Sequence, residues 1–255
     1  MVYPGFRRAT RRPDGPSAMR ARPIATHPWL PRLIVGERVV LRRHTPANLA
    51  AFQRWYTDRE VVALTRYRDE PMTRDEVTRF FYARVLGPDS LAMAIHRRSD
   101  GRLIGTCSFS QLDPESGSVL YHITIGEKDC WGQGYGTEAT QLMLSVAFGT
   151  FGLHRVSLTV FAFNERAIRS YRRCGFRVEG RARDAVWRQG RYWDEITMGI
   201  LRSEWEALQR RDGHPAGGPE TGATSADVPE GPGRPVSLPT PRLRRLGPAF
   251  RRGRR

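Results

Sequence analysis

The glycine-rich segment at residues 131–137, which reads WGQGYGT, constrains the fold more than any other part of the chain. Residues 118–126 before it are typical of a strand, and residues 138–151 after it carry apolar side chains that suit a helix. Glycine lets the backbone adopt positive φ and approach a ligand closely. In such a strand–turn–helix unit several N–H groups point the same way, and the helix dipole adds positive potential. The segment therefore predicts a site for a phosphate or a pyrophosphate.

Two common nucleotide-binding loops do not fit this segment. A P-loop requires Gly-Lys followed by Ser or Thr, and no such sequence follows the glycines. The dinucleotide fingerprint requires the spacing G-x-G-x-x-G, whereas Gly132, Gly134 and Gly136 alternate. The predicted anion site therefore belongs to a different kind of loop.

Capping and turn signals divide the middle of the chain into short elements. Thr73 and Glu76 stand three apart as a capping box, and Asp100-Gly101 is typical of a hairpin turn. The expected strands are two segments within 33–43, then 91–96, 103–111, 118–126, 155–161, 177–187 and 191–201, and the expected helices are 45–56, a short one after residue 58, 73–86, 138–151 and 164–174. This order predicts an α/β or α+β domain with a mixed sheet.

The two ends of the chain differ from the middle in composition. Residues 1–32 contain six prolines without a hydrophobic period, and residues 211–255 are rich in Pro, Gly and Arg. We therefore expect two disordered tails around one folded domain at residues 33–210. Most of the formal net charge of +16 lies in these tails. They predict either weak contact with nucleic acid or an anionic surface, or merely solvated segments, and the absence of interleaved aromatic residues favours the latter.

Membrane, secreted and metal-binding classes are not indicated. The longest nearly apolar stretch, residues 142–153, is too short and interrupted to span a bilayer, and no apolar segment follows the N-terminal arginines. Cys107, Cys130 and Cys174 are odd in number and lack a CxxC pair, so neither a disulfide framework nor a zinc site is expected. A cytoplasmic protein without a metal is the expectation.

A second motif begins at Asn164. Asn164, Ala167, Tyr171 and Gly175-Phe176 form N-x-x-A-x-x-x-Y-x-x-x-G-F. Asn164 and Tyr171 are seven residues apart, so both face one side of a helix, and the small Ala167 leaves room along that face. An ordinary N-cap, a packed tyrosine and a glycine C-cap explain the same pattern without a ligand.

Together the two motifs resemble the GNAT superfamily of acyl-CoA-dependent N-acetyltransferases. Residues 131–136 match its Q/R-x-x-G-x-G/A loop, with Trp131 in place of Gln or Arg. This departure is common in the branch of the ribosomal-protein alanine N-acetyltransferases, whose habitual segments also look like residues 36–42, 190–195 and 198–201. The resemblance spans roughly residues 33–205 in the expected order. It implies a mixed, mostly antiparallel central sheet with a splayed strand pair, flanked by about four helices.

The resemblance also implies roles for particular residues. The backbone around residues 123–126 would pair with the pantetheine arm of acetyl-CoA, the loop amides would hold the pyrophosphate, and Tyr171 would donate a proton to the leaving thiolate. The residues assigned in this way to the coenzyme are Ile123, Thr124, Ile125, Gln133, Gly134, Tyr135, Gly136, Thr137, Asn164, Ala167 and Tyr171. Arg169, Arg172 and Arg173 are placed either near the 3′-phosphate or on a solvated face.

The general base stays open at this point. Tyr121 and His122 stand near the position where relatives often carry an acid, and alternation turns one of them away. His122 is preferred because its unperturbed pKa is closer to neutrality. Glu138 and water are the alternatives, although stabilisation of the helix N-terminus is the preferred role for Glu138. Asp194 and Glu195 are expected either to bind a cationic acceptor or to make a buried structural contact. Cys130 and Cys174 are expected to be buried residues without a covalent role.

The resemblance implies an amine acceptor. Because an ammonium ion is not a nucleophile, the enzyme must either bind the amine in its neutral form or remove its proton before it attacks. The resemblance favours a protein N-terminal α-amine, with a small amine, an amino sugar or an antibiotic as alternatives. Aromatic residues at 55–75 and 184–195 suit a hydrophobic or planar acceptor as well as plain packing. A longer acyl donor, or a non-catalytic acyl-CoA sensor or nucleic-acid-associated module with basic tails, would fit the same fold. The protein is expected to be a monomer or a homodimer.

Overall fold

A mixed sheet forms the centre of the domain. The computed structural model describes residues 30–211, and both expected tails lie almost wholly outside them. The strand order is β1-β2-β3-β4-β5-β6-β8-β7, and only β5 and β6 are parallel neighbours. The strands are β1 (Leu33–Val35), β2 (Val39–Arg43), β3 (Leu91–Arg97), β4 (Leu103–Asp113), β5 (Ser118–Ile125), β6 (Arg155–Phe161), β7 (Arg177–Arg188) and β8 (Arg191–Leu201).

Six α-helices accompany the sheet in the described part of the chain, where about four were expected. They are α1 (Leu49–Thr57), α2 (Arg59–Thr65), α3 (Arg74–Phe80), α4 (Tyr135–Ser145), α5 (Glu165–Arg173) and α6 (Arg202–Arg211). Thr73 and Glu76 form the predicted capping box of α3, and Asp58 caps α2 by accepting from the backbone N–H groups of Glu60 and Val61. The elements predicted between residues 33 and 201 are therefore present.

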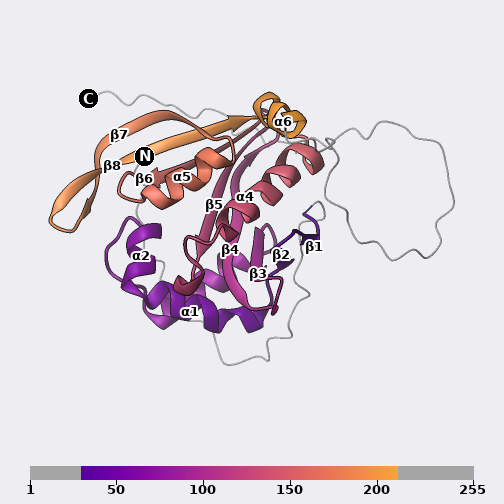
Figure 1. The fold of residues 1–255 in the computed structure, drawn as a ribbon. Helices are drawn as coiled ribbons and strands as arrows, with labels where there is room; N and C mark the ends of the chain where they lie inside the picture. The colour runs from indigo at the N-terminus through magenta and orange to yellow at the C-terminus, as the bar shows by residue number, and fades with distance from the viewer. Residues whose placement is uncertain (1–29, 212–255) are drawn as a thin grey trace, which may run out of the picture. The chain divides into compact units, whose positions relative to one another are not determined.

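The helices divide between two apolar clusters. The larger cluster contains Met93, Ile95 and Tyr121 of the sheet together with Met143 of α4 and Ile168 of α5. The smaller cluster consists of apolar side chains from α1, α2, α3 and the turn that follows α3, joined by Ala92 of β3. In Figure 1, α4 and α5 lie across the strands, and α1 and α2 lie at the lower end of the sheet. Because neighbouring residues of β3 enter different clusters, the two groups of helices cover opposite faces of the sheet.

The structure differs from the sequence expectation at several helix boundaries and by one additional helix. Helix α4 begins at Tyr135 rather than at residue 138, because Gly134 adopts a φ of 88° and serves as its N-cap. Helix α6 was not predicted. Its first residue, Arg202, directly follows the last residue of β8, and Glu204 accepts a hydrogen bond from the backbone N–H of Leu201 across this junction.

The parallel strands β5 and β6 separate after a short paired region. Their register runs only from Ser118 opposite Arg155 to Leu120 opposite Ser157. Beyond this point β5 stays paired to β4 on its outer side, and β6 stays paired to β8. The inner backbone edges of both strands are therefore left without a strand partner in the described domain. This is the splayed pair that the family resemblance implied, and α4 lies in the connection between its two members.

None of the helices described between residues 30 and 211 is long and apolar enough to cross a bilayer. All three cysteines are free and buried, with Cys130 2% and Cys174 3% exposed. The expectation that they fill small apolar spaces is therefore confirmed for the described domain.

Candidate active site

The glycine-rich loop leads directly into the N-terminus of α4. Gly132 and Gly134 have positive φ values of 75° and 88°, which a residue with a side chain adopts only under strain. Gly136 lies in the first turn, and a Cβ at this position would approach Ile125 to 3.5 Å and Ile123 to 3.9 Å. The helix therefore packs closely on β5, and its free N–H groups begin beside the unpaired edge of that strand. This geometry fits a pyrophosphate group.

Arg38 adds a positive charge to this loop. Its Nη1 donates a 2.7 Å hydrogen bond to the carbonyl oxygen of Gln133, and its guanidinium lies 4.7 Å from the centre of the Tyr135 ring. A Cβ on Gly134 would stand 3.2 Å from Arg38 Nη1. Sequence reasoning did not select Arg38 as a site residue, although it lies in the 36–42 segment that carries the family resemblance. Only the packing of β2 against α4 brings it to the loop.

Glu138, in the first turn of α4, also connects this helix to the backbone at Arg38. Its Oε1 accepts hydrogen bonds from the backbone N–H groups of Arg38, at 2.8 Å, and Val39, at 3.2 Å. Both bonds tie the first turn of α4 to the start of β2. These contacts account for Glu138 as a structural residue, in agreement with the preferred interpretation of its position.

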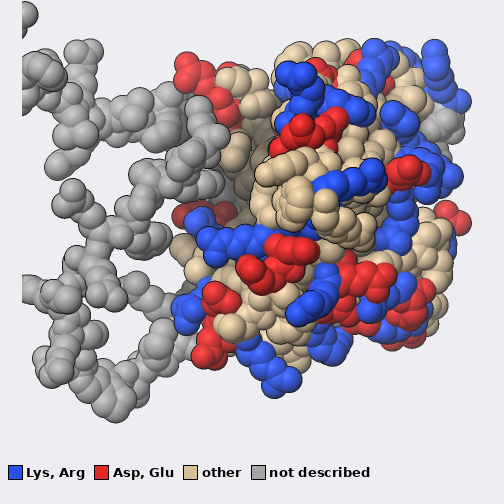
Figure 2. Space-filling view, turned by 90° about the vertical axis from the view of Figure 1, so that its left-hand side faces the viewer, with Lys and Arg blue, Asp and Glu red and all other residues tan. Residues whose placement is uncertain are grey.

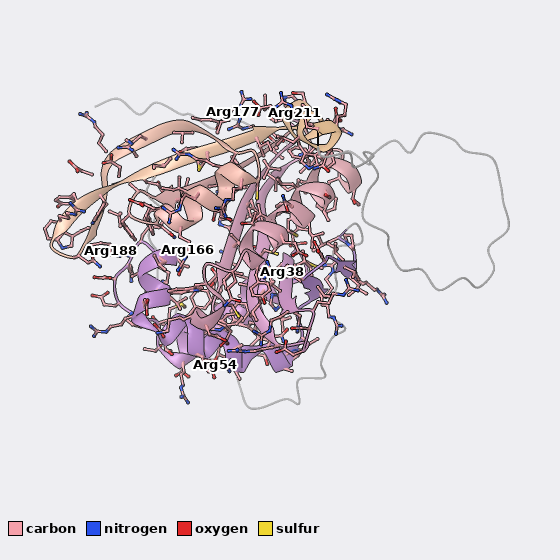
Figure 3. All side chains as sticks on the ribbon, viewed as in Figure 1. Arg38, Arg54, Arg166, Arg177, Arg188 and Arg211 are labelled. Atoms are coloured by element: carbon pink, nitrogen blue, oxygen red, sulfur yellow. The ribbon has the colours of Figure 1, made fainter. Side chains whose placement is uncertain are left out.

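Trp131 occupies the loop position at which the sequence departs from the family pattern. Its indole Nε1 donates a 2.7 Å hydrogen bond to the carbonyl oxygen of Ile125 at the end of β5. The guanidinium of Arg166, in the first turn of α5, lies 4.1 Å from the centre of the indole ring. In Figure 3, Arg166 lies between α5 and α2. Trp131 therefore joins the loop to both β5 and α5.

Helix α5, which carries the second motif, lies beside α4. The side chain of Asn164 caps the helix by accepting a 3.2 Å hydrogen bond from the backbone N–H of Ala167. Thr137 Oγ1 and Ser170 Oγ are 2.8 Å apart, and Cys174 Sγ lies 3.5 Å from the carbonyl oxygen of Thr137. These contacts hold the two predicted motifs against each other.

Tyr171 faces the sheet from α5 and is 8% exposed. Its ring packs edge-on against Phe176 with 5.9 Å between ring centres. Burial, together with nearby Cys174, raises the pKa of the Tyr171 hydroxyl above its ordinary value. The phenol is therefore protonated at neutral pH and able to donate a hydrogen bond or a proton.

The alternation along β5 places Tyr121 and His122 on opposite faces of the sheet. Tyr121 is 3% exposed, its hydroxyl lies 3.2 Å from Thr140 Oγ1 of α4, and burial raises its pKa. His122 points to the opposite face, where its Nε2 lies 2.7 Å from Ser110 Oγ. Desolvation by the protein around the strand lowers the pKa of His122, so the ring is neutral at pH 7 and able to accept a proton.

The two acidic candidates on β8, Asp194 and Glu195, have different partners. Asp194 pairs with Arg181 at 2.9 Å and accepts a 3.0 Å hydrogen bond from the backbone N–H of Asp184, so it stiffens the β7–β8 hairpin. Glu195 accepts a hydrogen bond from the hydroxyl of Tyr67, a residue of the segment between α2 and α3.

Among the arginines of α5, Arg169 forms an exposed pair with Glu165 at 3.1 Å. No group of three or more His, Cys, Asp or Glu side chains is placed to hold a metal within residues 30–211.

The fold, the glycine-rich loop and the splayed strands together indicate an acyltransferase. Comparison with known proteins identifies the family. A family model described as an acetyltransferase (GNAT) domain matches residues 38–177. This match covers more than half of the chain, so the chain belongs to the GNAT acetyltransferase family. The protein is an N-acetyltransferase, and acetyl-CoA is the donor that enzymes of this family use.

Individual relatives support the same class. The chain is 26% identical over 172 residues to the "Uncharacterized N-acetyltransferase p20" of Bacillus licheniformis, a match that covers 66% of this chain and 96% of that protein. It is 33% identical over 114 residues to the spermidine N(1)-acetyltransferase of Escherichia coli (strain K12), covering 45% of this chain and 61% of that protein. The first match extends over almost the whole relative, and the second over part of it.

Solved structures share the fold. The spermidine N-acetyltransferase from Vibrio cholerae in complex with CoA and spermine superposes with a TM-score of 0.60 at 21% identity, covering 67% of this chain and 99% of that chain. A GNAT-family acetyltransferase from Bacillus anthracis gives a TM-score of 0.59 at 20% identity, covering 68% of this chain and 99% of that chain. At these identities the likeness concerns the fold.

Proposed function

We propose that this protein transfers the acetyl group of acetyl-CoA directly to a primary amine, which is either a small molecule or a protein N-terminal α-amine. The divergence of β5 and β6 beside the N-terminus of α4 carries this proposal. It leaves a strand edge free to bind an amide-containing arm, and it ends at a loop suited to a pyrophosphate. Bound acetyl-CoA would supply the activated thioester.

On the donor side, the backbone N–H groups of residues 133–137 hold the pyrophosphate, with Arg38 beside them. The inner edge of β5 at residues 123–125 pairs with the pantetheine arm, and Asn164 and Ala167 form the start of the α5 wall. Burial keeps Tyr171 protonated, so it serves as the proton donor to the leaving sulfur. These assignments rest on the position of each group around the splayed strands.

On the acceptor side, His122 takes the proton of the amine. Its ring is neutral at pH 7, lies on the face of β5 opposite to α4, and stands two residues beyond Leu120, the last residue of β5 that pairs with β6. A backbone N–H of the unpaired β5 edge stabilises the oxyanion. The two faces of the sheet thus serve the two substrates.

The similarity to the E. coli spermidine N(1)-acetyltransferase supports a small-molecule acceptor, and the resemblance to the ribosomal-protein branch supports a protein α-amine. A nucleic-acid-binding role receives no support from the face in Figure 2, where Lys and Arg side chains alternate with Asp and Glu. A strong footprint for nucleic acid would concentrate basic side chains.

Calorimetric titration of the full chain with acetyl-CoA, followed by acetylation assays with amines and peptide N-termini, tests the proposal. The Gly134→Val variant should lose acetyl-CoA binding, because valine strains a backbone φ of 88° and approaches Arg38. Gly152→Val is the matched control, since Gly152 has a φ of 65°, follows the C-terminal end of the helical segment that α4 begins, and has no atom within 4 Å of an added Cβ. Unchanged acetyl-CoA affinity in Gly134→Val would refute the loop assignment, and binding without transfer to any amine would favour an acyl-CoA sensor.

A further inference from the structure

Glu195 is unusual among the half-buried carboxylates of the described domain. Five of them, at Asp58, Glu127, Asp194, Glu204 and Glu206, form ion pairs with Arg or Lys. Glu138 forms none, but it accepts two backbone N–H groups. Glu195 has no ion pair within residues 30–211, and the hydroxyl that it accepts from Tyr67 is neutral. Its negative charge is therefore available to an incoming cation, which would compensate its partial desolvation.

The partner Tyr67 is presented to solvent rather than buried for stability. Its side chain is 60% exposed, although its hydroxyl is bonded to Glu195. Arg188, which is 4% exposed, holds the surrounding segment: its guanidinium donates to the carbonyl oxygen of Arg66 and lies 3.4 Å from Asp69. In Figure 3, Arg188 lies between the β7–β8 hairpin and α2. The fold thus uses a buried cation to place Tyr67 over β8.

Aromatic rings extend from this pair. The Tyr67 ring packs edge-on against Phe161 at 5.3 Å, Phe161 stacks on Phe163 at 5.4 Å, and Phe163 meets Trp193 at 5.4 Å. The guanidinium of Arg191 already lies 3.4 Å from the centre of the Trp193 ring. Aromatic faces next to a carboxylate suit an organic cation with an apolar chain.

The cluster stands at the open end of the splayed strands. Phe161 and Glu195 are directly opposite each other in the β6–β8 register, so both side chains lie on one face of the sheet. Phe161 is the last residue of β6 and lies beyond the point where β5 and β6 stop pairing. On β8, Ile196 and Met198 enter the larger apolar cluster with α4 and α5, so by alternation Glu195 faces away from those helices. His122, on β5, is turned to the same side.

We infer that Glu195, framed by Tyr67 and Phe161, binds a second positively charged group of the acceptor, which makes the preferred substrate a small amine with at least two cationic centres. This inference rests on the proposed acetyl transfer and narrows its acceptor class. Glu195 is a specificity residue in this scheme. It holds the end of the acceptor that does not react, while the reacting end, whose proton His122 takes, reaches the separated strands.

Paired amines test the inference. Acetyl transfer is measured with 1,4-diaminobutane, n-butylamine and 4-amino-1-butanol, which differ only in the second end group. The full chain should favour the diamine over both monoamines by about tenfold or more in kcat/KM, as expected for a charge-assisted contact. Glu195→Gln, which keeps the shape and a hydrogen-bond partner for Tyr67, should remove that preference. The same variant should leave the acetyl-CoA affinity and the n-butylamine rate within about twofold.

Glu206→Gln is the matched control, because Glu206 is also half-buried but pairs with Arg202 on α6 at 3.0 Å. It should keep the preference for the diamine. Equal rates with the diamine and the monoamines, an unchanged preference in Glu195→Gln, or faster acetylation of an uncharged peptide's N-terminus would overturn the inference while leaving acetyl transfer intact. Transfer to none of these acceptors despite acetyl-CoA binding would instead overturn the proposed function and the inference with it.

Discussion

Tyr171 and His122 are both uncharged at neutral pH, although their pKa values move in opposite directions. Burial raises the pKa of the Tyr171 phenol, and desolvation by the surrounding protein lowers that of the His122 imidazole, although the His122 side chain is partly open to solvent. In each case desolvation disfavours the charged form, which is an anion for tyrosine and a cation for histidine. The same physical effect therefore holds Tyr171 in the protonation state that can give a proton and His122 in the state that can take one, while it makes Tyr171 a weaker acid and His122 a weaker base.

Tyr171→Phe removes the phenolic proton while keeping the ring that packs on Phe176. If Tyr171 protonates the leaving sulfur, kcat should fall about a hundredfold, because general acid catalysis contributes at least that much. The dissociation constant of acetyl-CoA should change by less than about twofold. Steady-state kinetics and calorimetry on the same preparation check this. Equal losses in turnover and in affinity would show that the residue only binds the donor.

His122→Gln keeps a hydrogen-bonding partner for Ser110 but removes the titrating ring. Because the pKa of His122 is lowered, the wild-type rate should persist below pH 6.5 and decline only as the ring becomes protonated. The variant should lose rate across the neutral range, and this acid-side decline should disappear from its pH profile. Rates of acetyl transfer from pH 5 to 9 provide the measurement. A variant profile parallel to the wild type would assign proton removal to water or to another group.

At the scale of elements, the parts with local signals were predictable. The capping box at Thr73 and the turn at Asp100-Gly101 appear where expected, because the hydrogen bonds they make are confined to a few residues. The start of α4 was predicted three residues late because the glycine that caps it also belongs to the loop. Helix α6 has no Ser, Thr, Asp or Asn before its first residue, so no N-cap signal separates it from β8.

Contacts between distant elements could not be predicted. Arg38 and Gln133 are 95 residues apart, and Tyr67 and Glu195 are 128 residues apart. No periodicity or spacing records such a pair. Alternation along β5 predicted that Tyr121 and His122 point to opposite faces of the sheet. Only the packing of α4 on Tyr121 showed which of the two faces the helix. The fold and the strand–glycine loop–helix geometry were therefore predictable, whereas the surroundings of each catalytic candidate required coordinates.

Arg38→Gln tests the junction between β2 and α4 as an element. It removes a charge and the bond to Gln133 beside the predicted pyrophosphate site. Acetyl-CoA affinity should fall about tenfold, which corresponds to one charge-assisted contact, with little change in kcat at saturating donor. Arg54→Gln is the control, since Arg54 is an exposed arginine paired with Glu127 at 2.9 Å. Equal affinity in both variants would mean that Arg38 acts on the loop without supporting the donor.

At the scale of the whole molecule, His44 lies between the sheet and the layer of helices that forms the smaller apolar cluster. It follows β2, and its Nε2 lies 2.9 Å from Thr106 Oγ1 of β4, while its ring packs against Phe52 of α1 at 5.2 Å and Phe81 at 6.2 Å. His44 is 6% exposed. Burial lowers its pKa to about 4, opposed by hydrogen bonds to Asn48 and to the backbone of Met93. The contact between the helical layer and the sheet therefore depends on a neutral imidazole.

This dependence predicts how the stability of the whole domain varies with pH. The unfolded chain protonates His44 near pH 6.5, whereas the folded chain keeps it neutral down to about pH 4. Stability contributed by His44 is complete above pH 6.5 and is lost as the pH falls from 6.5 toward 4, because the unfolded state binds the proton first. Between pH 7 and pH 5 the loss should be about 2 kcal/mol.

Urea unfolding of wild type and His44→Gln at both pH values isolates this amount, since carboxylates contribute equally to both proteins. The variant should be less stable at pH 7 but lose about 2 kcal/mol less on acidification. An equal loss in both proteins would mean that the folded domain accommodates the imidazolium without separating the helices from the sheet.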